Sequence, residues 1–259
     1  MTTATRLERW TRAEAAERGG GTVVVLPVGS LEQHGPHLPL GTDTILAEHI
    51  ARQAVDQVWE REGVPCVVAP AFAYGCSHHH LPFGGTASME TEHLLGALRD
   101  VVGSLLVSGF GGVFLLNGHG GNQEVVDLAA RDVGLSHQSY VAAGSYFHMA
   151  RPALLADADV VGNLGELPGH AGSFETSLML AVQPELVRLS DAPRRNEPAE
   201  GWPTPPPYRL ARPGPFRGGD GFSDDPSRAD AQTGARLLQL CVNAVGDALA
   251  NFHRHLARP

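Results

Sequence analysis

Acidic and imidazole side chains gather in one short glycine- and proline-rich segment, residues 29–43. Glu32 and His34 lie two positions apart, so in an extended chain both point to the same side and can converge on a cation. Asp43 ends the segment, and its two carboxylate oxygens could bridge a pair of ions. We therefore treat these residues as candidate ligands of two divalent ions. The alternative is structural, with Asp43 capping a following helix.

His119 lies in a second candidate segment, the turn Asn117-Gly-His-Gly-Gly-Asn122. Glycines on both sides let the backbone approach a ligand closely and leave the imidazole little to pack against. This favours a ligand over a structural histidine. A glycine-rich turn before a helix can also bind phosphate, but no lysine follows to complete a P-loop.

Strands and helices must position these segments. Short apolar runs predict four buried strands, at residues 23–28, 66–70, 112–116 and 140–145. Apolar side chains at helical spacing predict four helices, over residues 44–60, 90–106, 122–133 and 229–253. The alternation predicts an α/β fold: a three-layer αβα sandwich with a mostly parallel, Rossmann-like sheet. Ligands bind beyond the carboxyl ends of such strands, where both candidate segments are expected.

The composition and net charge limit the classes of partner and substrate that the protein is expected to have. A chain of 259 residues with 42% hydrophobic residues can bury one core, so we expect a single domain over residues 1–259. The formal net charge of −9 argues against nucleic-acid or membrane partners and favours a small-molecule or short-peptide substrate. The three cysteines form no CxxC pair, and no signal peptide or membrane span is visible, so we expect a cytoplasmic protein. Residues 191–227, rich in proline and glycine, predict an irregular insertion.

A third segment, His170-Ala-Gly-Ser-Phe-Glu175, completes a set of motifs that resembles the creatininase family of metal-dependent amidohydrolases. The resemblance extends over roughly residues 22–190. It implies a creatininase-type fold, a homohexamer, and two divalent ions per chain, zinc and/or manganese, with iron also compatible. It places the ligands at Glu32, His34, Asp43 and His119, with Asp43 bridging the ions.

The chain departs from the creatinine hydrolases of that family directly after His119. Those enzymes have Tyr and then Glu there, and the Glu is a metal ligand, whereas this chain has Gly120 and Gly121, which we assign to substrate binding. A Trp and an Asp before the third motif are replaced by Glu166 and Leu167. Creatinine is therefore not the expected substrate.

Because Gly121 has no side chain, we predict that Glu175 is both the replacement ligand and a catalytic group. The alternative for Glu175 is a carboxylate that interacts favourably with a helix N-terminus. His170 is predicted to be catalytic, delivering a proton to the leaving nitrogen. The triplet 78–80 contains two further substrate-binding candidates, His78 and His80, although a solvated loop is the alternative. His37 is a candidate for orienting the metal loop.

The expected reaction is hydrolysis of a C–N bond (amide, cyclic amide or formamide) through a metal-bridging hydroxide. Two alternatives remain. A metal-dependent isomerase or lyase could use the same ions to remove a proton next to a carbonyl, and a non-catalytic assembly subunit could keep the metals for stability alone.

Overall fold

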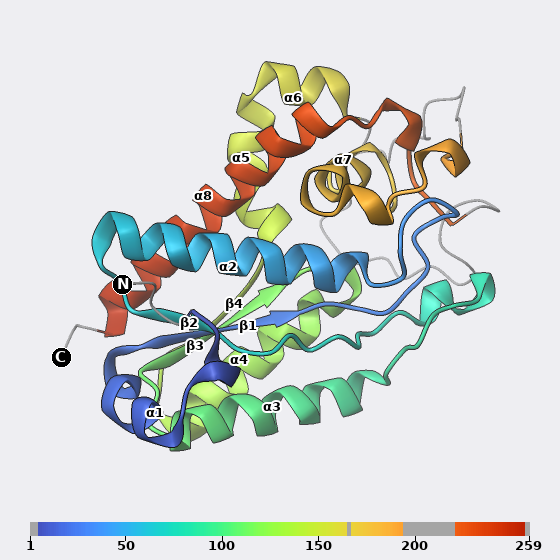
Figure 1. Cartoon of the computed structure of the whole chain (residues 1–259). Helices are drawn as coiled ribbons and strands as arrows, with labels where there is room; N and C mark the ends of the chain where they lie inside the picture. The colour runs from blue at the N-terminus through green and yellow to red at the C-terminus, as the bar shows by residue number, and fades with distance from the viewer. Residues whose placement is uncertain (1–4, 165–166, 194–220, 257–259) are drawn as a thin grey trace.

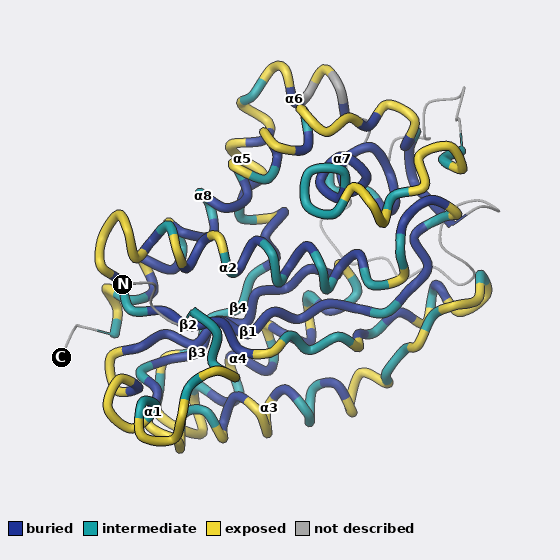
Figure 2. The backbone as a smooth tube through the Cα atoms, viewed as in Figure 1, coloured by how far each residue is buried: buried dark blue, intermediate teal, exposed yellow. Residues whose placement is uncertain are grey.

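The computed structural model describes residues 5–164, 167–193 and 221–256. In this part of the chain four strands form one parallel sheet in the order β2-β1-β3-β4 (Figure 1). They are β1 (Val23–Val28), β2 (Cys66–Val68), β3 (Gly112–Asn117) and β4 (Val141–Ser145). β1 and β3 are buried at every residue (Figure 2), as the apolar runs predicted for strands covered on both faces.

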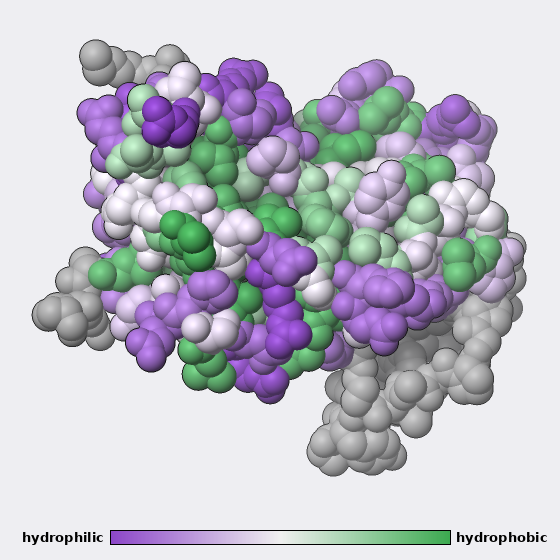
Figure 3. Space-filling model, turned by 90° about the horizontal axis from the view of Figure 1, so that it is seen from below, coloured by the Kyte–Doolittle hydropathy of each residue, from purple (hydrophilic) through white to green (hydrophobic). Residues whose placement is uncertain are grey.

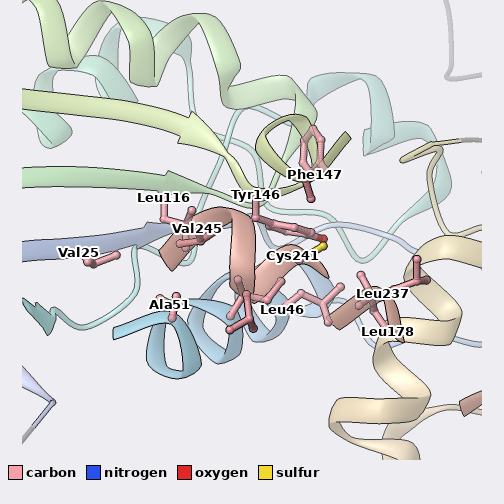
Figure 4. Packing of buried hydrophobic residues seen from close by; sticks show 14 of the residues in the cluster. Val25, Leu46, Ala51, Leu116, Tyr146, Phe147, Leu178, Leu237, Cys241 and Val245 are labelled. Atoms are coloured by element: carbon pink, nitrogen blue, oxygen red, sulfur yellow. The ribbon is translucent and has the colours of Figure 1, made fainter. Parts of the chain in front are cut away.

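Helices cover both faces of the sheet, which confirms the predicted three-layer α/β fold. One face carries α2 (Thr42–Glu62), α5 (Tyr146–Ala156), α7 (Ser173–Val182) and α8 (Ala231–Leu256), and the other carries α3 (Thr91–Val107) and α4 (Gln123–His137) (Figure 1). Alternate side chains of β1 enter the two cores: Val25 packs with α2 and α8 (Figure 4), and Val24 packs with α3 and α4. The remaining helices are α1 (Arg12–Arg18) and α6 (Ala158–Asn163).

The structure corrects several predicted boundaries. α2 begins at Thr42 rather than residue 44, so Asp43 lies inside its first turn and does not cap it, Gly41 being the N-cap. β2 ends at Val68, two residues early, because Pro70 has no N–H for a strand ladder. Three helices, α1, α5 and α6, were not predicted. α5 begins at Tyr146, directly after the last residue of β4, so no loop separates the strand from the helix in the sequence.

Two segments outside the predicted strands and helices differ in how far they can be described. In the loop 71–88, residues His78–Phe83 form a 3₁₀ helix, η3. In the segment 191–227, residues 194–220 lie outside the described residues. The end of that segment folds inward, since Phe222, Ser223 and Asp224 are buried.

The surface seen from the α3 side carries apolar side chains interspersed among hydrophilic ones (Figure 3). Val107 at the end of α3 is 79% exposed, and Leu135 on α4 is 74% exposed. Single exposed apolar residues are ordinary on soluble surfaces and require no partner. No helix within the described ranges is both long and apolar enough to cross a membrane.

Candidate metal centre

The predicted ligands meet at the carboxyl edge of the sheet, although they come from four separate elements. Glu32 and His34 follow β1, Asp43 lies in the first turn of α2, His119 follows β3, and Glu175 lies in the first turn of α7. All five residues are buried, with at most 6% of any residue exposed. Burying charged groups away from water is costly unless they are paired, so these five side chains must interact with one another or with a bound ion.

Asp43 lies between two imidazoles. Its Oδ1 lies 3.2 Å from Nε2 of His34, and its Oδ2 lies 3.1 Å from Nδ1 of His119. A second carboxylate accompanies each imidazole: Oε2 of Glu32 is 3.2 Å from Nδ1 of His119, and Oε2 of Glu175 is 3.8 Å from Nε2 of His34. The cluster thus has two halves that share the Asp43 carboxylate.

Gly118 allows the two halves to come together. A Cβ at this position would lie 2.6 Å from the backbone oxygen of Asp43, so only glycine lets the turn after β3 lie against the first turn of α2. The Asn117 side chain holds the turn by accepting from the backbone N–H of His119 at 3.1 Å and donating to its carbonyl at 2.7 Å. This approach brings the His119 imidazole to Asp43.

The site is suited to cations. Its donor atoms form three groups whose members lie within 4.8 Å of one another: Glu32, Asp43 and His119; His34, Asp43 and Glu175; and Glu32, His34 and His170. Three buried atoms of this cluster have no hydrogen-bond partner among the described residues, namely Oε1 of Glu32, Nε2 of His34 and Oδ2 of Asp43. Leaving such atoms unsatisfied is costly, and divalent ions would satisfy them. The mixture of carboxylate and imidazole ligands accepts several first-row metals.

The electrostatics of the side chains also favour positive charge in the cluster. Burial opposes the charged imidazole of His34, but the carboxylates of Asp43 and Glu175 raise its pKa to about 10. The pKa of His119 is likewise raised well above its usual value by Glu32 and Asp43, against the effect of burial. Burial and the neighbouring Asp43 raise the pKa of Glu175 to about 7, although His34 acts in the opposite direction. The carboxylates therefore stabilise any cation held between them.

His170 lies against this cluster, as its predicted role requires. Its ring centre is 4.4 Å from that of His34, and its Nδ1 lies 3.6 Å from Oε1 of Glu32. Burial and the nearby imidazoles lower the pKa of His170 well below its usual value, which favours a neutral ring. Two hydrogen bonds join His170 to Ser223. The backbone N–H of His170 donates to Oγ of Ser223 at 2.7 Å, and the backbone N–H of Ser223 donates to the His170 carbonyl at 2.8 Å.

The predicted substrate-binding residues occupy different environments. His78 is exposed and contacts Ser88 and Glu90 rather than the cluster. His80 is only 1% exposed, and its ring stacks on that of His170 with centres 4.2 Å apart. Nothing lies within 4 Å of a Cβ built at Gly120. At Gly121 a Cβ would lie 2.4 Å from Nε2 of His119, so a side chain there would displace that imidazole.

Several residues that the sequence analysis did not single out contact the site. Oγ of Ser77 donates to Glu32, and Asp224 accepts from the backbone N–H and the hydroxyl of Ser173 at the start of α7. His37, which was already a candidate for orienting the metal loop, contacts α7 through Nε2, which lies 2.9 Å from Oγ1 of Thr176, next to Glu175. Only proximity to a motif could have suggested Ser77, which lies beside the histidine triplet. No local pattern pointed to Asp224.

The comparisons decide the family. The sequence model of the creatininase family, described as creatinine amidohydrolase, matches residues 7–249. The chain belongs to the creatininase family. Creatinine amidohydrolase from Pseudomonas putida is 31% identical over 255 residues, which is 93% of each chain. A mycofactocin precursor peptide peptidase from Mycolicibacterium smegmatis is 35% identical over 237 residues, 89% of this chain and 85% of the relative.

Solved structures agree with this assignment. A creatininase mutant complexed with creatine superposes with a TM-score of 0.81 at 30% identity, covering 96% of this chain and 99% of that one. Creatininase structures with manganese and of a Zn–Zn type give TM-scores of 0.79 and 0.77. The creatininase-type fold and a C–N hydrolase of this family, as predicted from the motifs, are thereby confirmed.

Proposed function

We propose that this creatininase-family chain hydrolyses an amide, cyclic amide or formamide bond of a small molecule or short peptide at a centre with two divalent ions. The observation that carries the proposal is the placement of Asp43, whose two oxygens face His34 and His119 separately. Glu32, Asp43 and His119 would hold one ion, and His34, Asp43 and Glu175 would hold the other. A cluster built for one ion would not need two complete ligand groups.

The ions, when bound, would supply an activated water near neutral pH and polarise the scissile carbonyl. We propose zinc and/or manganese, supported by the creatininase structures that carry these metals, with iron also compatible with the ligands. Glu175, whose pKa burial raises to about 7, replaces the ligand that Gly121 cannot provide.

His170 is proposed to move the proton that the reaction requires. An amine is a poor leaving group until its nitrogen is protonated, so a group must take a proton from water and return it to that nitrogen. His170 has the position for this, with Nδ1 3.6 Å from Oε1 of Glu32 at the edge of the cluster. Its lowered pKa keeps the ring neutral and able to accept a proton.

The substrate is proposed to be something other than creatinine. Gly120 and Gly121 leave the space beside His119 without the side chains that creatinine hydrolases have there. Of the other two departures, Glu166 lies outside the described residues, and Leu167 packs against the core. We retain His78, Gly120 and Gly121 as proposed substrate contacts. A homohexamer and a cytoplasmic location also remain proposals, which light scattering and cell fractionation would test.

The test is hydrolysis in labelled water. Metal-stripped protein, reloaded with Zn²⁺, Mn²⁺ or Fe²⁺, is screened against formamides, cyclic amides and short peptides in H₂¹⁸O, with Asp43→Ala as the control. We expect metal-dependent turnover with ¹⁸O in the carboxylate product. Turnover without incorporation would instead support an isomerase or lyase, and a metal-loaded protein without any turnover would support the assembly subunit.

A further inference from the structure

The side chain of Gln33 joins the metal loop to two histidines, and its amide orientation is fixed by the backbone. Its Nε2 donates to the carbonyl of Gly221 at 2.8 Å, and its Oε1 accepts from the N–H of Gly35 at 3.0 Å. A carbonyl only accepts and a backbone N–H only donates. In the opposite orientation of the amide, Oε1 would face the Gly221 carbonyl, which is also an acceptor, and Nε2 would face the Gly35 N–H, which is also a donor.

This orientation determines the tautomer of His80. Nε2 of Gln33 lies 2.8 Å from Nδ1 of His80. An amide nitrogen can only donate, so Nδ1 is the acceptor, and the neutral ring carries its hydrogen on Nε2. That Nε2 lies 3.3 Å from Oε1 of Glu32, which is within ion-pair distance although the two atoms are not in hydrogen-bond geometry. Gln33 thus directs the N–H of His80 toward a carboxylate of the cluster.

The same residue determines the tautomer of His170. Nε2 of His170 lies 2.9 Å from the backbone oxygen of Gln33 and 3.1 Å from its side-chain nitrogen. The two amide hydrogens are directed at Gly221 and His80, and the backbone oxygen can only accept. Nε2 of His170 therefore carries the hydrogen. Its Nδ1, the atom nearest Oε1 of Glu32, is left as the basic atom.

We infer that Gln33 is a positioning residue that fixes both tautomers, so that His170 takes and returns the proton through Nδ1 and His80 orients the Glu32 carboxylate through Nε2–H. The inference deepens the proposed function and rests on it, because Glu32 is treated as an ion ligand only there. It also gives His80 a role other than substrate contact. Groups that orient metal ligands typically change metal affinity 10- to 100-fold when they are removed.

The decisive test reads the tautomers directly. Solid-state ¹⁵N spectra of metal-free protein with ring-labelled histidine distinguish Nδ1–H from Nε2–H, and the signals are assigned by their loss in His80→Gln and His170→Ala. We expect Nε2–H at both residues. In Gln33→Glu the new carboxylate can only accept, so His80 should change to a ring protonated at Nδ1. Gln53→Glu is the matched control, because Gln53 contacts His49 at 2.7 Å on the surface, and it should leave His80 unchanged.

The second measurement is Zn²⁺ affinity, by competition with a chelator. Gln33→Met removes the amide without adding charge and should weaken Zn²⁺ binding 10- to 100-fold, whereas Gln53→Met should not. Circular dichroism checks that each variant is folded. An Nδ1–H tautomer of His80 in the unaltered protein, or no change in Gln33→Glu, would overturn the inference. If the unaltered protein bound no Zn²⁺, the proposed function would fail, while the tautomer result would still decide the role of Gln33.

Discussion

Oδ1 of Asp43 lies 3.2 Å from Nε2 of His34, and neither side chain is more than 3% exposed. Because the other oxygen of Asp43 faces His119, one carboxylate links both halves of the cluster. This relationship supports the proposal that the motif after β1 belongs to a centre for two ions rather than one.

Replacing Asp43 should remove both ions together. We expect about two divalent ions per chain in the unaltered protein and a loss of both in Asp43→Ala, since each half depends on one oxygen of this carboxylate. Elemental analysis after desalting measures this. Full metal content in the variant would exclude a bridging role, and loss of a single ion would assign Asp43 to one half only.

His170→Ala should keep its metal ions but lose most of its turnover. The imidazole is assigned to proton transfer, so the variant should keep its ions and lose on the order of 10²–10⁴-fold in turnover. Rates on the substrate found by screening, measured alongside elemental analysis, test this. His170 also belongs to one of the three potential ligand groups, so loss of metal in the variant would make it a ligand instead.

Creatinine should be converted poorly or not at all. Gly121 has no side chain that could bind a metal ion, and a Cβ at this position would lie 2.4 Å from Nε2 of His119. The side chain introduced by Gly121→Glu should therefore displace the His119 imidazole, so this variant should bind less metal and should not gain creatinine hydrolysis. A turnover assay with Zn²⁺ and Mn²⁺ decides both points, and efficient conversion by the unaltered protein would show that these glycines do not control the substrate.

Two glycine substitutions should change stability in opposite directions. A Cβ at Gly234 on α8 would lie 1.8 Å from the backbone oxygen of Ser177 on α7, so Gly234→Ala should destabilise the protein by about 1–3 kcal/mol. No atom lies within 4 Å of a Cβ at Gly96 inside α3, so Gly96→Ala should stabilise it by roughly 1 kcal/mol. Denaturant unfolding compares the two. Equal effects would mean that α7 and α8 do not pack as closely as described.

The thiols should differ in reactivity. Burial raises the pKa of Cys66 and of Cys241 to about 12, so at pH 8 only about one thiol in 10⁴ at each site is the reactive thiolate. Cys76 is only partly buried. Iodoacetamide at pH 8 should therefore label Cys76 in the folded protein and all three cysteines in guanidinium, as peptide mass spectrometry can establish. Rapid labelling of Cys241 without denaturant would contradict its burial.

The sequence by itself determined the class of the fold and the chemistry of the site. Continuous apolar runs such as Val23–Val28 are typical of strands buried on both faces, and their alternation with amphipathic helices predicts a parallel sheet with helices on each side. Parallel strands end at one edge, so the segments containing Glu32 and His119 were bound to come near each other. These conclusions depend on residue types and short spacings, which the sequence displays directly.

Only the tertiary structure decided which atoms face one another. The two oxygens of Asp43 point to different imidazoles because Asp43 lies inside the first turn of α2 and because Gly118 lets the turn after β3 approach that helix closely. The amide of Gln33 contacts Gly221, which lies 188 positions away in the chain. Contacts between such distant residues arise when several elements pack at once, and a side chain's orientation then follows from the backbone groups that surround it. Local periodicity contains no information about those groups, so the network around His80 and His170 could not be predicted from the sequence.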